Sequence, residues 1–166
     1  MESHAAVSGM PRGPGRAGGV DYGLLEKLTG YAVRRAQLVI TEAFDAAMAG
    51  EGLTTQRFSA LVLIARNPGL SQAELARVMR ISPPQTTVVV DALVERGLVE
   101  RRAQDGDRRA RRLFVTQLAE QRLPQIEAKV VSHDDRVMAG LSAVERKELR
   151  RLLGAVVKTQ GELDRG

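Results

Sequence analysis

The chain has 166 residues, a net charge of +5 and a pI of about 10.2, and 43% of its residues are hydrophobic but only 3% aromatic. This length suits one domain, or one domain with an appended helical part, and aliphatic side chains must build most of its core. The lack of Cys excludes disulfides and thiol-based sensing, and no apolar run approaches the roughly 20 residues of a membrane span. Without the apolar core of a signal peptide at its start, we expect a cytoplasmic protein with no membrane partner.

Residues 1–20 are rich in Gly and Pro and include two arginines. This composition predicts a disordered basic tail, because it offers too little apolar surface to bury. A second interpretation is a basic arm that touches a DNA minor groove.

A long helix is predicted over Asp21–Ala49, where apolar residues recur at three- and four-residue spacing and glycines follow. Arg35 falls on the apolar stripe, and Tyr31 and Arg34 flank it. An Arg in that position needs a partner. It either pairs with an acid of a partner subunit, extends its charged end to water, or binds an anion in an effector pocket.

The next helix is expected to begin after Thr54 as its N-cap and to end at Asn67-Pro68-Gly69. Phe58, inside this helix, suits the core, with the wall of a ligand pocket as the alternative. Leu70 is expected to form a short strand.

Two helices with a tight connection follow, and each opens with a capping box in which a Ser precedes a Glu or Gln by three residues. They are Ser71–Val78, with Ser71 and Glu74, and Ile81–Arg96, with Ser82, Pro83 and Gln85. Gly97 suits the end of the second helix.

A basic hairpin is predicted next, with strands Gly97–Arg102 and Arg109–Thr116 joined by a turn at Gln104–Asp107. From Glu95 to Arg112 there are seven Arg against four acids. Helix, tight connection, helix and basic hairpin make up a winged helix-turn-helix, which lays its second helix in the DNA major groove. The fold class expected is therefore mainly α with a small β-hairpin wing, and double-stranded DNA is the expected partner.

The residues just described resemble the MarR family (multiple antibiotic resistance regulators) over roughly Tyr22 to Leu163. The resemblance rests on Ile81–Thr87, Asp91–Arg101, Asp107–Ala110 and Leu113–Thr116, of which the wing signature is the most specific part. It implies a two-fold dimer formed through the terminal helices.

Residues expected to contact DNA lie at the starts of both helices and along the second one. They are Ser71, Gln72, Ser82, Pro84, Gln85, Thr86, Thr87 and Val88. Gln can pair with adenine, and Thr can donate to a base or phosphate or pack on a thymine methyl. Val88 is expected either to meet such a methyl or to join the core, to which Val89, Val90 and Leu93 are assigned.

In the wing, Arg108, Arg111 and Arg112 are candidates for phosphate contacts. The resemblance implies that Asp107 orients Arg109, which enters the minor groove. For any one of these arginines, a solvated strand face is the alternative.

Two more helices are expected after the wing, Gln117–Ala139, which contains Pro124, and a last one to Leu163 after a third capping box at Ser142 and Glu145. The apolar stripe of the last helix needs a covering surface, and a second copy of the chain supplies one. We therefore assign residues 21–52 and 117–163 to a helical dimerisation region and residues 53–116 to the winged helix-turn-helix domain.

His133-Asp134-Asp135 is interpreted as a group of polar residues exposed to solvent rather than as a metal site, and no catalytic residues or cofactor are predicted. The expected function is a repressor, associated with the nucleoid, that leaves a pseudo-palindromic operator when an effector binds. In MarR-like proteins a crevice holds anionic aromatic ligands, and Gly30–Leu38 resembles regulators of aromatic-acid or aryl-CoA breakdown. These resemblances imply an aromatic carboxylate or an aryl-CoA bound by Tyr31, Arg34, Arg35 and Phe58. The alternatives are a constitutive or architectural DNA-binding protein without a sensor, and a protein-interaction module that does not bind DNA.

Overall fold

The computed structural model describes residues 20–104 and 107–163, and the side chains of residues 20–103 and 111–158. The chain divides into two compact units, Met1–Val39 and Ile40–Gly166, which are described separately below. The predictions for the N-terminal tail (residues 1–19) and for the tip of the hairpin (residues 105–106) concern residues outside the described ones.

The first unit shows that the long helix expected from Asp21 is interrupted. A 3₁₀ turn, η2, spans Gly23–Lys27, and helix α1 begins only at Thr29 and runs to Met48 in the second unit. The prediction of one helix was wrong at this end, because the Asp21 carboxylate accepts a hydrogen bond from the Gly23 N–H at 2.8 Å and Gly23 is left-handed, with φ 52°. Leu28 is extended between the two elements.

The second unit contains the end of α1, a 3₁₀ turn η3 at Ala49–Glu51, and five further helices. These are α2 Thr55–Arg66, α3 Gln72–Met79, α4 Pro83–Glu95, α5 Gln117–Val137 and α6 Ala143–Leu163. The predicted helices are confirmed in order and type.

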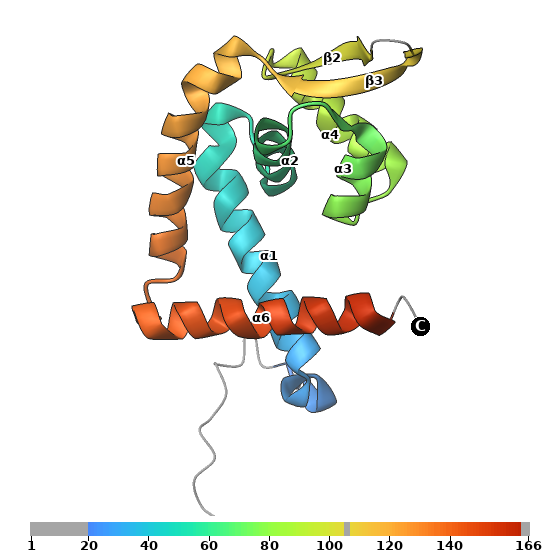
Figure 1. Ribbon diagram of the computed structural model, residues 1–166. Coiled ribbons are helices and arrows are strands. Elements are labelled where there is room, and N and C mark those ends of the chain that lie inside the picture. The colour runs from blue at the N-terminus through green and yellow to red at the C-terminus, as the bar shows by residue number, and fades with distance from the viewer. Residues whose placement is uncertain (1–19, 105–106, 164–166) are drawn as a thin grey trace, which may run out of the picture. The chain divides into compact units, whose positions relative to one another are not determined.

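A three-stranded antiparallel sheet accompanies these helices, in the order β1-β3-β2. Its strands are β1 Leu70–Ser71, β2 Val99–Gln104 and β3 Asp107–Val115. Leu113 pairs with Leu70 on one side and with Arg101 on the other, so β1 is the bridging strand expected at Leu70. Figure 1 shows β2 and β3 side by side as a hairpin next to α4. The winged helix-turn-helix is thereby confirmed.

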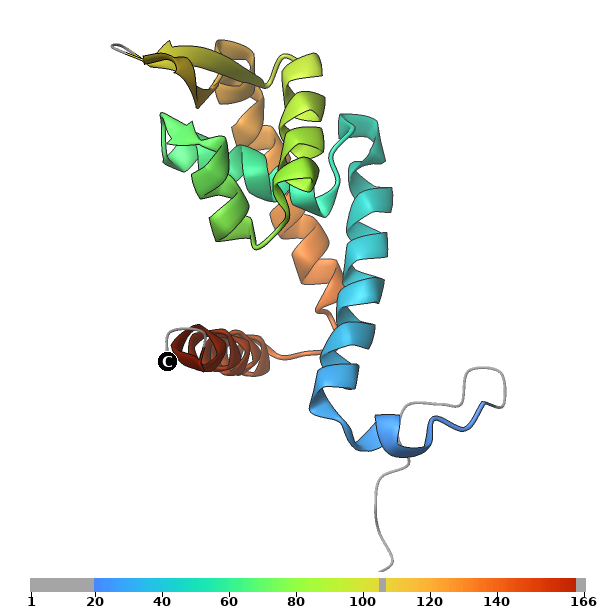
Figure 2. The same ribbon diagram turned by 90° about the vertical axis from the view of Figure 1, so that its right-hand side faces the viewer.

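The core of the second unit lies among α2, α3, α4 and the sheet, and α2, α3 and α4 pack against one another beside the hairpin (Figure 2). Leu61, Leu75, Leu93 and Leu113 supply one aliphatic side chain from each of these elements, and each is at most 1% exposed. The expectation of an aliphatic core, with Val89, Val90 and Leu93 inside it, is confirmed.

The helix starts follow the capping pattern of the sequence. The Thr54 hydroxyl accepts a hydrogen bond from the Arg57 N–H at the start of α2, and all three predicted capping boxes are formed. At the other end of α4, Gly97 follows the last helical turn with φ 65°, a conformation that costs glycine little.

Helix α6 presents its apolar stripe to solvent. Six of its Val and Leu side chains are exposed by 36% to 78%: Val144, Leu149, Leu152, Leu153, Val156 and Val157. In the first unit, several apolar side chains between Leu24 and Val39 are likewise exposed. None of the helices within the described residues is long and apolar enough to cross a membrane.

Candidate nucleic-acid interface

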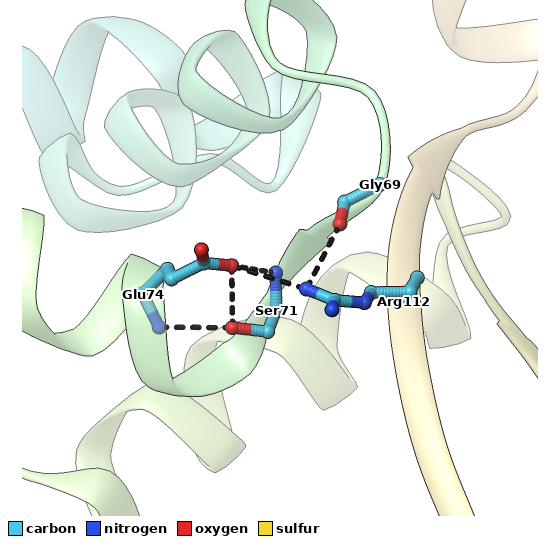
Figure 3. Close-up of polar contacts among 4 residues, drawn as sticks. All are labelled: Gly69, Ser71, Glu74 and Arg112. Carbon is cyan, nitrogen blue, oxygen red and sulfur yellow. Dashed lines mark hydrogen bonds and ion pairs between the residues drawn. The ribbon is translucent and has the colours of Figure 1, made fainter. Parts of the chain in front are cut away.

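The start of α3 is fixed to the wing by a cluster of hydrogen bonds around Glu74 (Figure 3). The Glu74 carboxylate accepts from the Ser71 N–H at 2.8 Å, from the Ser71 hydroxyl at 2.6 Å and from the Arg112 guanidinium at 3.3 Å. Arg112 also donates to the Gly69 carbonyl at 3.5 Å. Hydrogen bonds from the Ser71 hydroxyl and N–H, followed by the charges of Arg112 and Arg77, hold the pKa of Glu74 below its usual range. The cluster thus links α3, β1 and β3 to one another.

This cluster changes the interpretation of two candidate DNA contacts. The Ser71 hydroxyl is engaged in the helix cap, and the Arg112 side chain, 33% exposed, is paired with Glu74. Arg112 was expected on a solvated face or at a phosphate, but the structure places it in a link between two elements. Arg111, one position earlier, is exposed and remains a candidate for a phosphate contact.

Most of the residues predicted on the recognition helix α4 are exposed, namely Pro84, Gln85, Thr87 and Val88, as is Ser82 before it. Thr86 is the exception, because its side chain is 0% exposed and its hydroxyl donates to the Ser82 carbonyl at 3.0 Å. The prediction that Thr86 faces DNA was wrong. Its spacing to Val89 and Val90, three and four residues on, places it on the buried face, and that periodicity could have identified it.

A hydrogen bond joins the two helices of the motif on their exposed side. The Gln72 amide donates to the Thr87 hydroxyl at 2.7 Å, and the Thr87 hydroxyl donates to the Pro83 carbonyl at 3.1 Å. Gln72 and Thr87, both predicted from the sequence, are therefore brought together, and their contact fixes the orientation of α3 against α4.

The base of the wing is held by an ion pair and a cation–π contact that sequence reasoning did not find. Arg101 of β2 contacts Asp91 of α4 at 2.5 Å, and the Arg102 guanidinium lies 4.5 Å from the centre of the Phe114 ring. These partners are far apart in sequence, so no local pattern identifies them. Two further cations were also missed: Arg77 on α3 and Arg80 at its C-cap are exposed, and Arg80 is left-handed with φ 52°.

The tip of the wing carries the other arginine candidates. Strand β3 begins at Asp107, whose backbone pairs with Gln104. The side chains of Asp107, Arg108 and Arg109 lie outside the described residues, so the expected orientation of Arg109 by Asp107 stays a prediction.

The candidate effector residues are divided between the two units. In the first unit the Tyr22 and Tyr31 ring centroids are 6.1 Å apart, and the exposed Arg35 guanidinium lies 5.4 Å from the Tyr22 ring. Arg34 is exposed. In the second unit Phe58 is half-buried against the core, 5.8 Å from the Phe44 ring. Arg35 thus has an aromatic partner that the sequence analysis did not anticipate.

His133, expected on the surface, is only 6% exposed, so that prediction was wrong. Its ring meets Phe44 edge-on at 5.8 Å, and its Nε2 has no hydrogen-bond partner among the described residues. His133 follows Ile126 and Val130 at helical spacing, which puts it on the inward face of α5. The described residues contain no group of acidic or His side chains able to hold a metal ion.

Similarity to known proteins identifies the family of this chain. The MarR family model matches residues 51–110, from the turn before α2 to the wing. The chain is 35% identical over 134 residues to a putative transcriptional regulatory protein for the hcr operon of Thauera aromatica, covering 80% of this chain and 81% of the relative. The chain belongs to the MarR family. It is a DNA-binding transcriptional regulator.

Two further relatives are transcriptional repressors. An HTH-type transcriptional repressor of Mycobacterium tuberculosis is 33% identical over 75% of this chain and 89% of its own length. The transcriptional repressor CouR, bound to a 23-mer DNA duplex, superposes with a TM-score of 0.77 at 34% identity, covering 83% of this chain and 98% of CouR. CouR bound to p-coumaroyl-CoA superposes with a TM-score of 0.74.

Proposed function

We propose that this MarR-family protein is a homodimeric repressor that binds a pseudo-palindromic operator and releases it when a small anionic aromatic molecule binds. In this proposal residues 53–116 form the DNA-binding domain, and residues 21–52 and 117–163 form the dimerisation region. The protein acts in the cytoplasm on the nucleoid and has no catalytic role.

The observation that carries the proposal is the exposed N-terminal half of α4, in a motif that also exposes several arginines. Residues 84, 85, 87 and 88 are exposed on a helix that is capped at its start and rigidly held at its rear by the core. Arg77 and Arg80, on and just after the α3 helix that packs against α4, and Arg111 of the wing are exposed and add positive charge to the same motif. Base edges are read by such a helix, whereas phosphates are held by the cations around it.

The dimer in this proposal is supported by the exposed apolar stripe of α6. A contiguous apolar face of this kind is unfavourable in water, and a two-fold arrangement buries the same stripe of both copies. In a dimer, two recognition helices reach successive major grooves about 34 Å apart.

The proposed class of effector is supported by the side chains near Arg35 and by the ligands of two relatives. Tyr22, Tyr31 and Arg35 combine aromatic surface with a cation, which suits an aromatic anion. CouR has been seen with p-coumaroyl-CoA, and a relative from Mycobacterium tuberculosis with salicylic acid. We propose Tyr31, Arg34 and Arg35 of the first unit as ligand-binding residues. For Phe58, of the second unit, a role in ligand binding is a separate prediction.

DNA binding is tested first, on a duplex selected from a random-sequence pool by the full-length protein. Replacing Arg109 with Ala should weaken binding to this duplex by roughly 1–3 kcal/mol, while Arg111→Ala should weaken specific and non-specific binding alike and reduce the salt slope by about one unit per subunit. Fluorescence anisotropy at several salt concentrations measures both. Unchanged affinity in both variants would mean that the wing does not touch DNA.

Effector binding is tested with salicylate and p-coumaroyl-CoA as probes on the same complex. We expect one of these classes to release the duplex. Arg35→Ala should raise the effector concentration required for release, while the affinity for DNA without effector stays unchanged. Arg66→Ala, which removes an exposed cation of α2, is the matched control. Tight, sequence-selective binding that no probe of either class disturbs would favour the constitutive or architectural alternative.

A further inference from the structure

The polar side chains on the exposed face of α4 are largely engaged within the chain. The Thr87 hydroxyl donates its only hydrogen to the Pro83 carbonyl and accepts from Gln72. The Gln85 carbonyl oxygen accepts from both the N–H and the hydroxyl of Ser82, at 3.1 and 3.0 Å. Thr87 therefore has no hydrogen left to donate to a base.

Gln85 is restricted in a different way. A glutamine that recognises adenine in the major groove accepts from the base N6 amino group through its own carbonyl and donates to N7 through its amide. Both lone pairs of the Gln85 carbonyl are occupied by the capping box, so its free group is the amide, a pure donor. While the cap is intact, Gln85 cannot pair with adenine in the bidentate way.

Apolar groups, by contrast, are open on the same face. Val88 is 65% exposed, and Pro84 and Thr87 are exposed beside it at helical spacing. Together they present methyl and methylene groups where the recognition helix meets the base edges. The base-edge group that such a surface fits is the 5-methyl of thymine, the one apolar group in the major groove.

We propose that the face formed by Pro84, Thr87 and Val88 selects the operator mainly through thymine methyl groups, and that Gln85 adds only a donor to an acceptor such as thymine O4 or guanine O6. This inference rests on the proposed function, because it assumes that α4 enters the major groove. Arg77, Arg80 and Arg111 are exposed on the same winged motif, and this positive charge favours DNA as the occupant.

The test replaces each thymine of the selected duplex by deoxyuridine, one position at a time, which removes only the methyl group. Removing a methyl buried against the protein should weaken binding about fourfold at one or two positions of each half-site. Val88→Ala should abolish this effect at one of those positions. Val131→Ala on α5, which truncates an equally exposed valine (62%), should leave every deoxyuridine effect unchanged.

The outcomes separate this inference from the proposed function. A duplex that is bound selectively but is insensitive to deoxyuridine at every position overturns the methyl readout and leaves the repressor proposal standing. Deoxyuridine effects that are identical in the wild type and in Val88→Ala also overturn it, since they arise elsewhere. A selection that enriches no sequence overturns both.

Discussion

The winged helix-turn-helix buries its apolar faces within one copy of the chain, whereas the terminal helical segments leave much of their apolar surface exposed. Around α3 and α4, helix starts are capped, the apolar faces are buried and the wing is tied to the helices by ion pairs. Helix α6, although capped at Ser142, exposes nearly its whole apolar stripe. The difference indicates that the DNA-binding region can fold within one chain, whereas α6 is completed only by another surface.

The largest expected effect tests that difference directly. Replacing Leu152 and Val156 by Glu puts two charges per chain into the proposed dimer interface, and burying them should weaken dimerisation by at least about 4 kcal/mol. Light scattering should show a dimer for the wild type and a monomer for the variant, and circular dichroism should show that the variant is still folded and helical.

Lys147→Glu, on the same helix but off the apolar stripe, is the control and should stay dimeric. A well-folded wild-type monomer at micromolar concentration would contradict the proposed dimer and the interpretation of α6.

The same two regions show which features a sequence reveals. Capping boxes at Ser71, Ser82 and Ser142 were predictable because donor and acceptor are three residues apart. The ion pair between Glu74 and Arg112 spans 38 residues, so only the fold brings its partners together. The sequence therefore did not reveal the partner of Arg112, and its phosphate contact stays a prediction.

Helical phase explains the other errors. Thr86 and His133 are polar by type, yet each continues an apolar stripe, and position rather than polarity decides which way a helical side chain faces. At both positions the helical spacing to neighbouring apolar residues predicts burial, whereas the residue type does not. The wing tip could be assigned only by resemblance, because its side chains lie outside the described residues.

A second, smaller effect concerns the connection between η3 and α5. The Glu51 side chain is 15% exposed and contacts Arg122 at 2.6 Å as well as Lys129. Hydrogen bonds from Lys129 and then Arg122 lower the pKa of Glu51. Glu51→Gln should reduce the free energy of unfolding by about 1–3 kcal/mol at pH 7, as measured by urea denaturation.

The pKa of Glu51 is lowered in the folded state. Its contribution to the free energy of unfolding is therefore present above the usual carboxyl pKa and is lost as the pH falls through the pKa of the folded state. The difference between the wild type and Glu51→Gln should therefore shrink in acid. Glu127→Gln, which removes a surface partner of Arg66 at 3.6 Å, should cost about 0.5 kcal/mol or less. Equal losses in the two variants would show that Glu51 is merely another surface charge.

The smallest effect compares two capping boxes of the same design, one in each region. In both, the Ser hydroxyl and then the Ser N–H lower the pKa of the Glu, at Glu74 by way of Ser71 and at Glu145 by way of Ser142. Glu74 has in addition the positive charge of Arg112. We expect carboxyl NMR titration to give Glu74 the lower pKa.

Both boxes should weaken as the pH falls, since a lowered folded pKa means that the stabilisation is present above the unfolded value and disappears on protonation. The box at Glu145 should open first, at the higher pH. Arg112→Ala should raise the pKa of Glu74 toward that of Glu145, and added salt should narrow the gap in the wild type by screening the ion pair. If the pKa of Glu74 in the wild type instead equals or exceeds that of Glu145, Arg112 does not hold the start of α3 to the wing. The DNA-binding region would then not differ electrostatically from the terminal helix, which is capped only by neighbouring residues.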